Sequence, residues 1–312
     1  MNDFAKISKY LADDEPDFSA CIGSVRSFDK SYRSFHLFNH HKPLKVEFRP
    51  SDRKLTISGN FGMYWQGQNF IFSDSDFRDS INHASEQLNV DLYSFNVDEF
   101  DQSAIVKVED DPDNIIRHHI SLKGHEVTIR KFGKYWNHPS HMVKLYNATK
   151  RMSQLYKKPV RDKISAELGV SQAGKLIRFE KKYKKPGKYF NRGMTLEELI
   201  RPGTIDLCNE DLILTYQNIM KTGKTTIPGN KKDINSSTLP LILLQELSEI
   251  HGFDTSEQIK KLIKSIPKDI LNANDRKQRQ RQITTNLRKI KSGECSPYDL
   301  IDKLTKELRP EG

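Results

Sequence analysis

The chain has 312 residues, of which 36% are hydrophobic and 29% charged, a balance typical of a folded globular protein rather than a disordered one. No stretch approaches the roughly 20 apolar residues that a membrane helix requires, so we expect no membrane partner. An acidic run stands near the start, where a signal peptide would need an apolar core, and the three cysteines lie far apart without metal or redox spacing. These features argue against export and favour a reducing, cytoplasmic location.

The net charge is +10, and it is distributed unevenly along the chain. Residues 123–192 contain 19 Lys or Arg and four acidic residues, a local net charge of +15, so the remainder of the chain sums to −5. A segment this one-sided repels itself unless a polyanion neutralises it, and nucleic acid is the commonest such partner. The alternative is a basic surface that faces only solvent.

The first 24 residues are expected to form a loosely held N-terminal arm. After them, short runs alternate apolar and polar residues, as antiparallel strands with one wet face do. These runs predict strands at 32–38, 44–48 and 54–59.

A loop rich in glycine and aromatic residues follows at 59–70. Ser73 or Ser75 then caps a helix, whose apolar residues recur at helical spacing. These are Phe77, Ile81, Ala84 and Leu88. A strand is expected at 95–108 and a short helix at 113–122.

Further strands are expected at 126–132, 142–146 and 176–179, and helices at 149–156 and 160–168. Because the buried Val and Ile runs of a parallel sheet are absent, this pattern predicts an α+β domain over residues 25–190, with an antiparallel sheet and helices packed on one face. Beyond 181–187 the composition shifts to Leu, Ile, Lys and Glu at helical spacing, over 195–222 and 238–309. We therefore expect a small helical C-terminal domain over residues 191–312.

Four segments resemble, in the same order, motifs of the replication initiators of filamentous phages and related plasmids (the gene II/gene X protein family). The most specific is ISGNFGMYWQGQNF at 57–70, which is similar to that family's "GN…K-F/W-x-Q-G-H-N" segment. The others are VDEFD at 97–101, YWNHPS with VKLYN at 135–140 and 143–147, and LIRFE at 176–180. The resemblance covers roughly residues 30–185.

The resemblance implies rolling-circle initiation, in which a tyrosine nicks one strand of origin DNA, single-stranded or in a hairpin, and keeps the 5′ phosphate. A bacterial host's replication machinery would then extend the free 3′ end. By motif position Tyr135 is the nucleophile, with Tyr146 and Tyr183 as alternatives. Asp101 and Glu180, on separate expected strands, would bind Mg²⁺ or Mn²⁺, which prefer carboxylate oxygens, and Lys144 would steady the reacting phosphate.

Basic residues around these motifs are expected to contact DNA phosphates: Lys131, Lys134, Lys150, Arg151, Arg178, Lys181 and Lys182. Other residues of these motifs have simpler structural interpretations. Glu180 could form a structural ion pair with Arg178 or Lys182, and Tyr64 and Trp65 could lie in a buried turn instead of stacking on bases.

The chain departs from the family pattern at Asn137, where glycine is usual, and at Ala148, where lysine is usual. The Ala148 departure favours an alternative function, a non-catalytic DNA-binding regulator derived from the same family. An unrelated RNA-binding protein is a third hypothesis.

A metal site built from histidines is less favoured by the sequence. No His-hydrophobe-His triplet occurs, and the adjacent pairs His40-His41 and His118-His119 would point to opposite faces of a strand. Phosphate-loop and dinucleotide-binding signatures are also absent.

Overall fold

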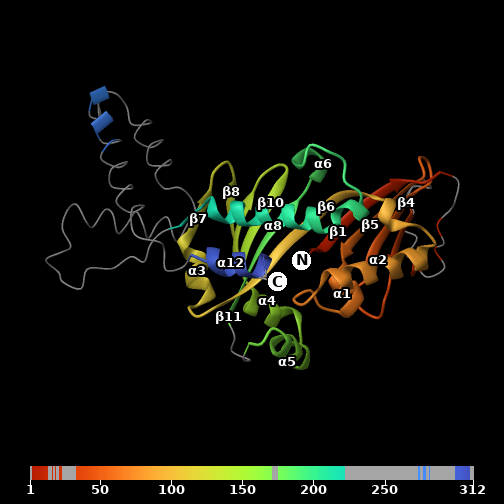
Figure 1. Ribbon diagram of the computed structural model, residues 1–312, viewed down its shortest axis with the longest axis horizontal. Coiled ribbons are helices and arrows are strands. Elements are labelled where there is room, and N and C mark those ends of the chain that lie inside the picture. The colour runs from red at the N-terminus through yellow and green to blue at the C-terminus, as the bar shows by residue number, and fades with distance from the viewer. Residues whose placement is uncertain are drawn as a thin grey trace.

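A ten-stranded antiparallel sheet forms the centre of the computed structural model (Figure 1). The structure describes residues 2–12, 16, 18, 21–22, 33–170, 175–221, 273–274, 277–278, 281 and 299–309. The strand order across the sheet is β2-β3-β4-β5-β1-β6-β11-β10-β9-β8. The strands are β1 (Asn2–Tyr10), β2 (Cys21–Ile22), β3 (Arg33–Leu37), β4 (Leu44–Arg49), β5 (Lys54–Asn60), β6 (Asn96–Val108), β8 (Glu126–Arg130), β9 (Gly133–Asn137), β10 (His141–Asn147) and β11 (Lys175–Tyr183). The α+β class and the antiparallel sheet are confirmed.

The N-terminal segment differs from the sequence expectation. Residues Asn2–Tyr10 are not a loosely held arm but a central strand, which pairs with β5 on one side and β6 on the other. Ala5 and Ile7 are fully buried in the core beneath it. The strand ends before the acidic residues that begin at Asp13.

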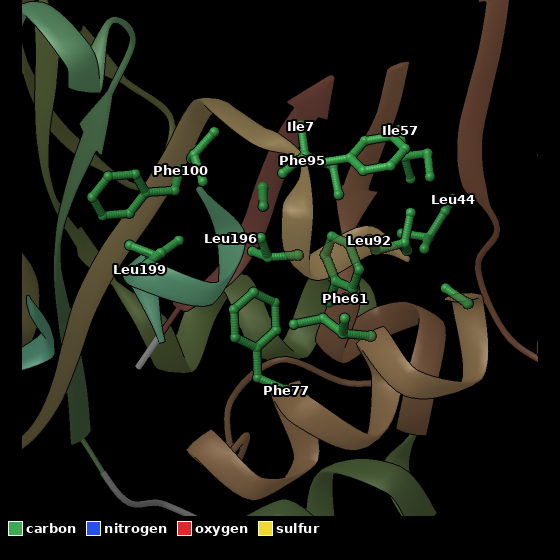
Figure 2. Close-up of a cluster of buried hydrophobic side chains, with 14 of the residues drawn as sticks. Ile7, Leu44, Ile57, Phe61, Phe77, Leu92, Phe95, Phe100, Leu196 and Leu199 are labelled. Carbon is green, nitrogen blue, oxygen red and sulfur yellow. The ribbon is translucent and has the colours of Figure 1, made fainter. Parts of the chain in front are cut away.

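The first hydrophobic core lies between the β1–β5 part of the sheet and two helices, α1 (Phe61–Gln66) and α2 (Asp74–Leu88) (Figure 2). Ser73 caps α2 in a capping box with Asp76, and the four predicted apolar positions of this helix are buried, which confirms the expected helix. The 3₁₀ turn η1 (Leu92–Ser94) and the short helix α7 (Leu196–Leu199) close the same core, with Leu92, Leu196 and Leu199 pointing into it.

Helices cover both faces of the other half of the sheet, not one face as expected. Successive residues of a strand point to opposite faces. Ile177 of β11 packs with α8 (Pro202–Gln217) and α12 (Ile301–Leu308), whereas Leu176 packs with α4 (Ala148–Leu155) and α5 (Lys158–Glu167). The residues of β11 are buried continuously from Leu176 to Lys181, as in a strand with two covered faces.

The described C-terminal residues do not form a core of their own. Both α8 and α12 contribute to the same cluster as Val143 and Phe179 of the sheet. The expected helix at 113–122 ends early, as α3 (Pro112–His118), and continues as β7 (His119–Leu122), which pairs with β12 (Ile219–Lys221). A short helix, α6 (Pro186–Tyr189), follows β11. Most of the expected helical region at 238–309 lies outside the described residues.

A buried polar chain ties α12 to the rest of the fold. The Leu300 backbone N–H donates to Tyr216 Oη (2.7 Å), Tyr216 Oη lies 2.7 Å from His119 Nε2, and His119 Nδ1 lies 2.8 Å from the Ile115 carbonyl oxygen. Because a carbonyl only accepts, His119 donates from Nδ1 and accepts the Tyr216 proton at Nε2. His119 is therefore held neutral, and burial lowers its pKa to about 3.

This network predicts acid sensitivity. Between pH 6.5 and 3 the unfolded chain binds a proton at His119 that the folded chain does not, so His119 alone should lower the free energy of unfolding by about 1.4 kcal/mol for each pH unit as the pH decreases. Urea unfolding at pH 7, 6 and 5 measures this slope. His119→Gln should reduce the slope, whereas His36→Asn, at an exposed strand position, should leave it unchanged. Equal slopes in all three proteins would contradict the assignment.

Candidate active site

A polar cavity of about 290 Å³ lies on the face of the sheet that also carries α4. Five of the six residues expected to carry chemistry line it: Asp101, Tyr135, Lys144, Tyr146 and Glu180, but not Tyr183. They come from the four adjacent strands β6, β11, β10 and β9. Residues 79 positions apart in sequence are thus gathered at one place by strand pairing.

The register of the strands explains this convergence. Tyr135 lies directly opposite Lys144, and Lys144 lies directly opposite Glu180. Glu180 in turn faces Ser103 of β6, and Asp101 stands two residues away on the same face. Directly opposed residues have Cβ atoms about 4.5–5.5 Å apart and diagonal ones about 7–8 Å, so the side chains form one row within mutual reach.

Lys144 lies between the two carboxylates. Its Nζ forms a short ion pair with Glu180 Oε1 and lies 3.4 Å from Asp101 Oδ2. Burial and the neighbouring Glu180 raise the pKa of Asp101, whereas Lys144 and Arg178 lower the pKa of Glu180 against the effect of its burial. The other oxygen of Asp101, Oδ1, is buried without a hydrogen-bond partner.

A buried ion pair supports the floor of the cavity. Arg178 Nη2 donates to Asp3 Oδ2 (2.7 Å) and Ser103 Oγ (2.8 Å), and its Nε lies 3.5 Å from Glu180 Oε2. The guanidinium is only 1% exposed and joins β1, β6 and β11. Arg178 therefore has a structural role, and the alternative in which Glu180 pairs with it fits this arrangement. Its buried guanidinium is not accessible to DNA.

The glycine-rich segment at 57–70 packs around this ion pair. The side-chain amides of Asn60 and Asn69 both donate to Asp3 Oδ2, at 3.0 and 2.7 Å, and the Asn69 carbonyl accepts from Arg178 Nη1 at 2.8 Å. Gly67 ends α1 in the left-handed region (φ 73°), which allows the chain to return toward Asp3. Tyr64 is fully buried within the short helix α1, where a loop was expected, so it is neither in a turn nor a base-stacking platform.

The three candidate tyrosines occupy different environments. Tyr135 lines the cavity and is partly exposed. Tyr146 also lines it, but its hydroxyl donates to Glu180 Oε2 (3.2 Å) and burial raises its pKa well above the usual value. Tyr183 is fully buried on the opposite face of β11, where its hydroxyl donates to Asp211. Only Tyr135 and Tyr146 are near the carboxylates.

The expected DNA-contacting residues separate into two groups. Lys131, Lys150 and Arg151 reach the surface, and Lys182 is partly exposed beside Glu99 (2.8 Å). Lys134 and Lys181 are buried together with Arg178. Lys134 Nζ donates to the carbonyls of Arg117 and His119, and Lys181 Nζ binds Asp211 (2.6 Å) on the face away from the cavity. A phosphate cannot reach these three side chains, so the prediction that they contact DNA is wrong and their role is structural.

Two groups of the site were missed by sequence reasoning. Asp3 was placed in the arm, and nothing in the sequence links it to Arg178, 175 positions later. Phe132 lines the cavity with Lys131 Nζ 5.1 Å from its ring centre and the Arg151 guanidinium carbon 5.9 Å away. In the sequence, Phe132 lies within the basic stretch from Arg130 to Lys134, and an aromatic residue among basic ones is typical of single-strand binding.

No protein-family model matches the chain, and no curated protein matches it either. In the part of the chain that the structure describes, no set of three or more His, Cys, Asp or Glu side chains is arranged to hold a metal ion. None of the described helices combines the length and apolarity needed to cross a membrane.

The Asp3–Arg178 pair gives a stability prediction. Asp3→Asn should lower the free energy of unfolding by about 3 kcal/mol, because it leaves a buried guanidinium without its main counter-charge. Urea unfolding at pH 7 measures the loss. Asp162→Asn, which removes half of the exposed pair with Lys158, serves as the matched control and should change little. A loss no larger than that of the control would show that Glu180 alone balances Arg178.

Proposed function

We propose that this protein nicks and rejoins one DNA strand as a rolling-circle replication initiator, with Tyr135 as the nucleophile. The observation that supports this best is the meeting of Tyr135, Lys144 and two carboxylates in one cavity. The motif resemblance had suggested these same residues. A phosphotyrosyl intermediate conserves the energy of the phosphodiester bond, which allows the cut strand to be rejoined.

In the reaction, Tyr135 Oη forms a bond to the scissile phosphorus while the bond from phosphorus to the 3′ oxygen breaks. The phenol releases its proton to solvent, and the leaving 3′ oxygen keeps the bonding electron pair and takes up a proton. The ammonium of Lys144, directly across the strand pair from Tyr135, stabilises the charge on the phosphoryl oxygens. The resulting 3′ hydroxyl is a primer for a host polymerase.

The carboxylates suit a divalent cation with oxygen ligands. Asp101 Oδ1 is a buried oxygen without a hydrogen bond, as an oxygen reserved for a cation would be. Two protein carboxylates are enough for Mg²⁺, which usually keeps several waters and binds substrate phosphates. Mg²⁺ or Mn²⁺ bound there supplies positive charge that polarises the scissile phosphate.

The mouth of the cavity offers a path for a DNA strand. Lys131 and Arg151 flank Phe132, and Lys150 follows on the exposed side of α4. Phosphates would pair with the basic side chains while an unstacked base lies on the Phe132 ring.

A covalent adduct tests the proposal. The full chain is incubated with Mn²⁺ and a 3′-labelled pool of randomised single-stranded and hairpin oligonucleotides, and label on the protein is measured on a denaturing gel. We expect an adduct that Tyr135→Phe reduces at least about a thousandfold, as loss of a nucleophile does. Sequencing of the attached DNA would identify the origin.

Two variants control this experiment. Tyr183→Phe changes a buried tyrosine outside the cavity and should leave the adduct intact. Tyr146→Phe should reduce the adduct much less than Tyr135→Phe. An adduct that survives Tyr135→Phe but not Tyr146→Phe would transfer the role of nucleophile to Tyr146.

The DNA path gives a separate prediction for binding. The double variant Lys131→Ala/Arg151→Ala should weaken binding to single-stranded DNA and lower the slope of log K against log salt by about 1.4, corresponding to two lost phosphate contacts. Fluorescence anisotropy at several salt concentrations measures the slope. Lys45→Ala, an exposed lysine on β4 in the other half of the sheet, should keep the original slope. An unchanged slope in the double variant would place the DNA elsewhere.

One observation favours the non-catalytic alternative. The ammonium of Lys144 contacts both Asp101 and Glu180, so part of the charge of the two carboxylates is balanced without any metal. A regulator would bind the oligonucleotides with the same salt dependence and form no adduct. An RNA-binding protein would instead prefer RNA of the same sequence.

A further inference from the structure

Three histidines from two segments of the chain meet at the edge of the sheet, away from the cavity. His125 precedes β8, His138 lies in the turn between β9 and β10, and His141 begins β10. Their ring centres are 4.7–5.2 Å apart. His141 shares its face of β10 with Val143, whereas Lys144 and Tyr146 point to the cavity face.

Two imidazole nitrogens of this cluster face each other. His125 Nε2 and His141 Nε2 are 2.8 Å apart. A hydrogen bond between them needs a proton on one nitrogen and a lone pair on the other. The partners of the remaining ring nitrogens decide whether that proton is present.

His125 has its proton on the other nitrogen. His125 Nδ1 lies 2.9 Å from the carbonyl oxygen of Lys123, and because a carbonyl only accepts, Nδ1 must donate. In the neutral ring, Nε2 of His125 therefore carries a lone pair.

Ser140 sets the state of His141. The Ser140 backbone N–H donates to His138 Nδ1 (3.3 Å), so this nitrogen is an acceptor and also receives the Ser140 hydroxyl proton (2.9 Å). Ser140 Oγ, 3.0 Å from His141 Nδ1, can then only accept from it. Neutral His141 thus also has a lone pair at Nε2. The facing Nε2 atoms of His125 and His141 are then both acceptors, and no proton lies between them.

We propose that His125 and His141 bind a transition-metal ion of the Zn²⁺ class between their Nε2 atoms. Two nitrogens bound tetrahedrally at about 2.0–2.1 Å from one ion are roughly 3.4 Å apart, so the two rings would move apart by roughly 0.6 Å from their separation of 2.8 Å. Each ring donates its other N–H, to a carbonyl or a hydroxyl, as metal-binding histidines commonly do. His138 supplies a third nitrogen only if its ring turns away from Ser140, and otherwise solvent completes the coordination.

The surroundings also favour a metal over an extra proton. His141 is only 9% exposed and His125 is partly buried, so neither ring is in a site that favours a charged imidazolium. The nearest ammonium, that of Lys181, is balanced by Asp211 at 2.6 Å. A metal here would fix the turn before β8 to the start of β10, and with them the hairpin strand β9 that carries Tyr135.

Cobalt binding tests this site without any activity assay. The full chain is freed of metal with a chelator and titrated with Co²⁺, in excess Mg²⁺ so that oxygen-ligand sites are filled. We expect one equivalent of Co²⁺ with visible d–d absorption, displaced by Zn²⁺, and a Zn²⁺-dependent rise in Tm. His125→Asn and His141→Asn should each weaken Co²⁺ binding at least tenfold, and His138→Asn should weaken it less.

His36→Asn, at an exposed position of β3, is the matched control and should bind Co²⁺ as the parent does. His125 is only partly buried in a turn, so its variant keeps the test valid if His141→Asn does not fold. Absence of Co²⁺ binding by the folded parent, or binding unchanged in His125→Asn, would overturn the proposal. Unchanged binding in His138→Asn would remove His138 as the third ligand. Because the site lies outside the cavity, either result leaves the strand-nicking proposal to be judged by its own adduct assay.

Discussion

The guanidinium of Arg178 is the buried charge on which both the sheet and the cavity depend. It cannot remain in the interior without counter-charges, and Asp3 and Glu180 supply them from β1 and β11. The amides of Asn60 and Asn69 complete the shell around Asp3. The same contacts that satisfy Arg178 therefore also fix the position of Glu180, the carboxylate that Lys144 and Tyr146 share.

Much of the fold could be predicted from local patterns. The alternation of a strand and the Ser73 cap of α2 each depend on residues only a few positions apart. The position of β1 could not, since a polar-apolar run such as Asp3 to Ile7 has the same appearance at an edge as in the centre of a sheet. The second layer of helices was missed for a related reason. Residues Leu176 and Ile177 show burial on both sides of β11, but no local pattern tells which helices provide it.

The candidate residues were proposed from motifs, and their convergence follows from a strand register that the sequence does not encode locally. The charge of the basic segment did not predict which side chains are accessible to DNA. Lys134 and Lys181 lie in this segment, yet their ammonium groups donate to buried acceptors inside the protein. The histidines show the reverse error. Adjacent pairs were considered and set aside, whereas His125 and His141, 16 positions apart, meet through two turns.

The central place of β1 has a consequence for biosynthesis. Asp3 leaves the ribosome 175 residues before Arg178, its principal partner, and β1 has to wait for β6 before its second edge is covered. Loop closure over such a distance is entropically costly, and β1 acquires its second neighbour only after residues 96–108 have been made. Until then the unpaired edge of β1 is open to pairing with other chains, and chaperones protect exposed edges of this kind.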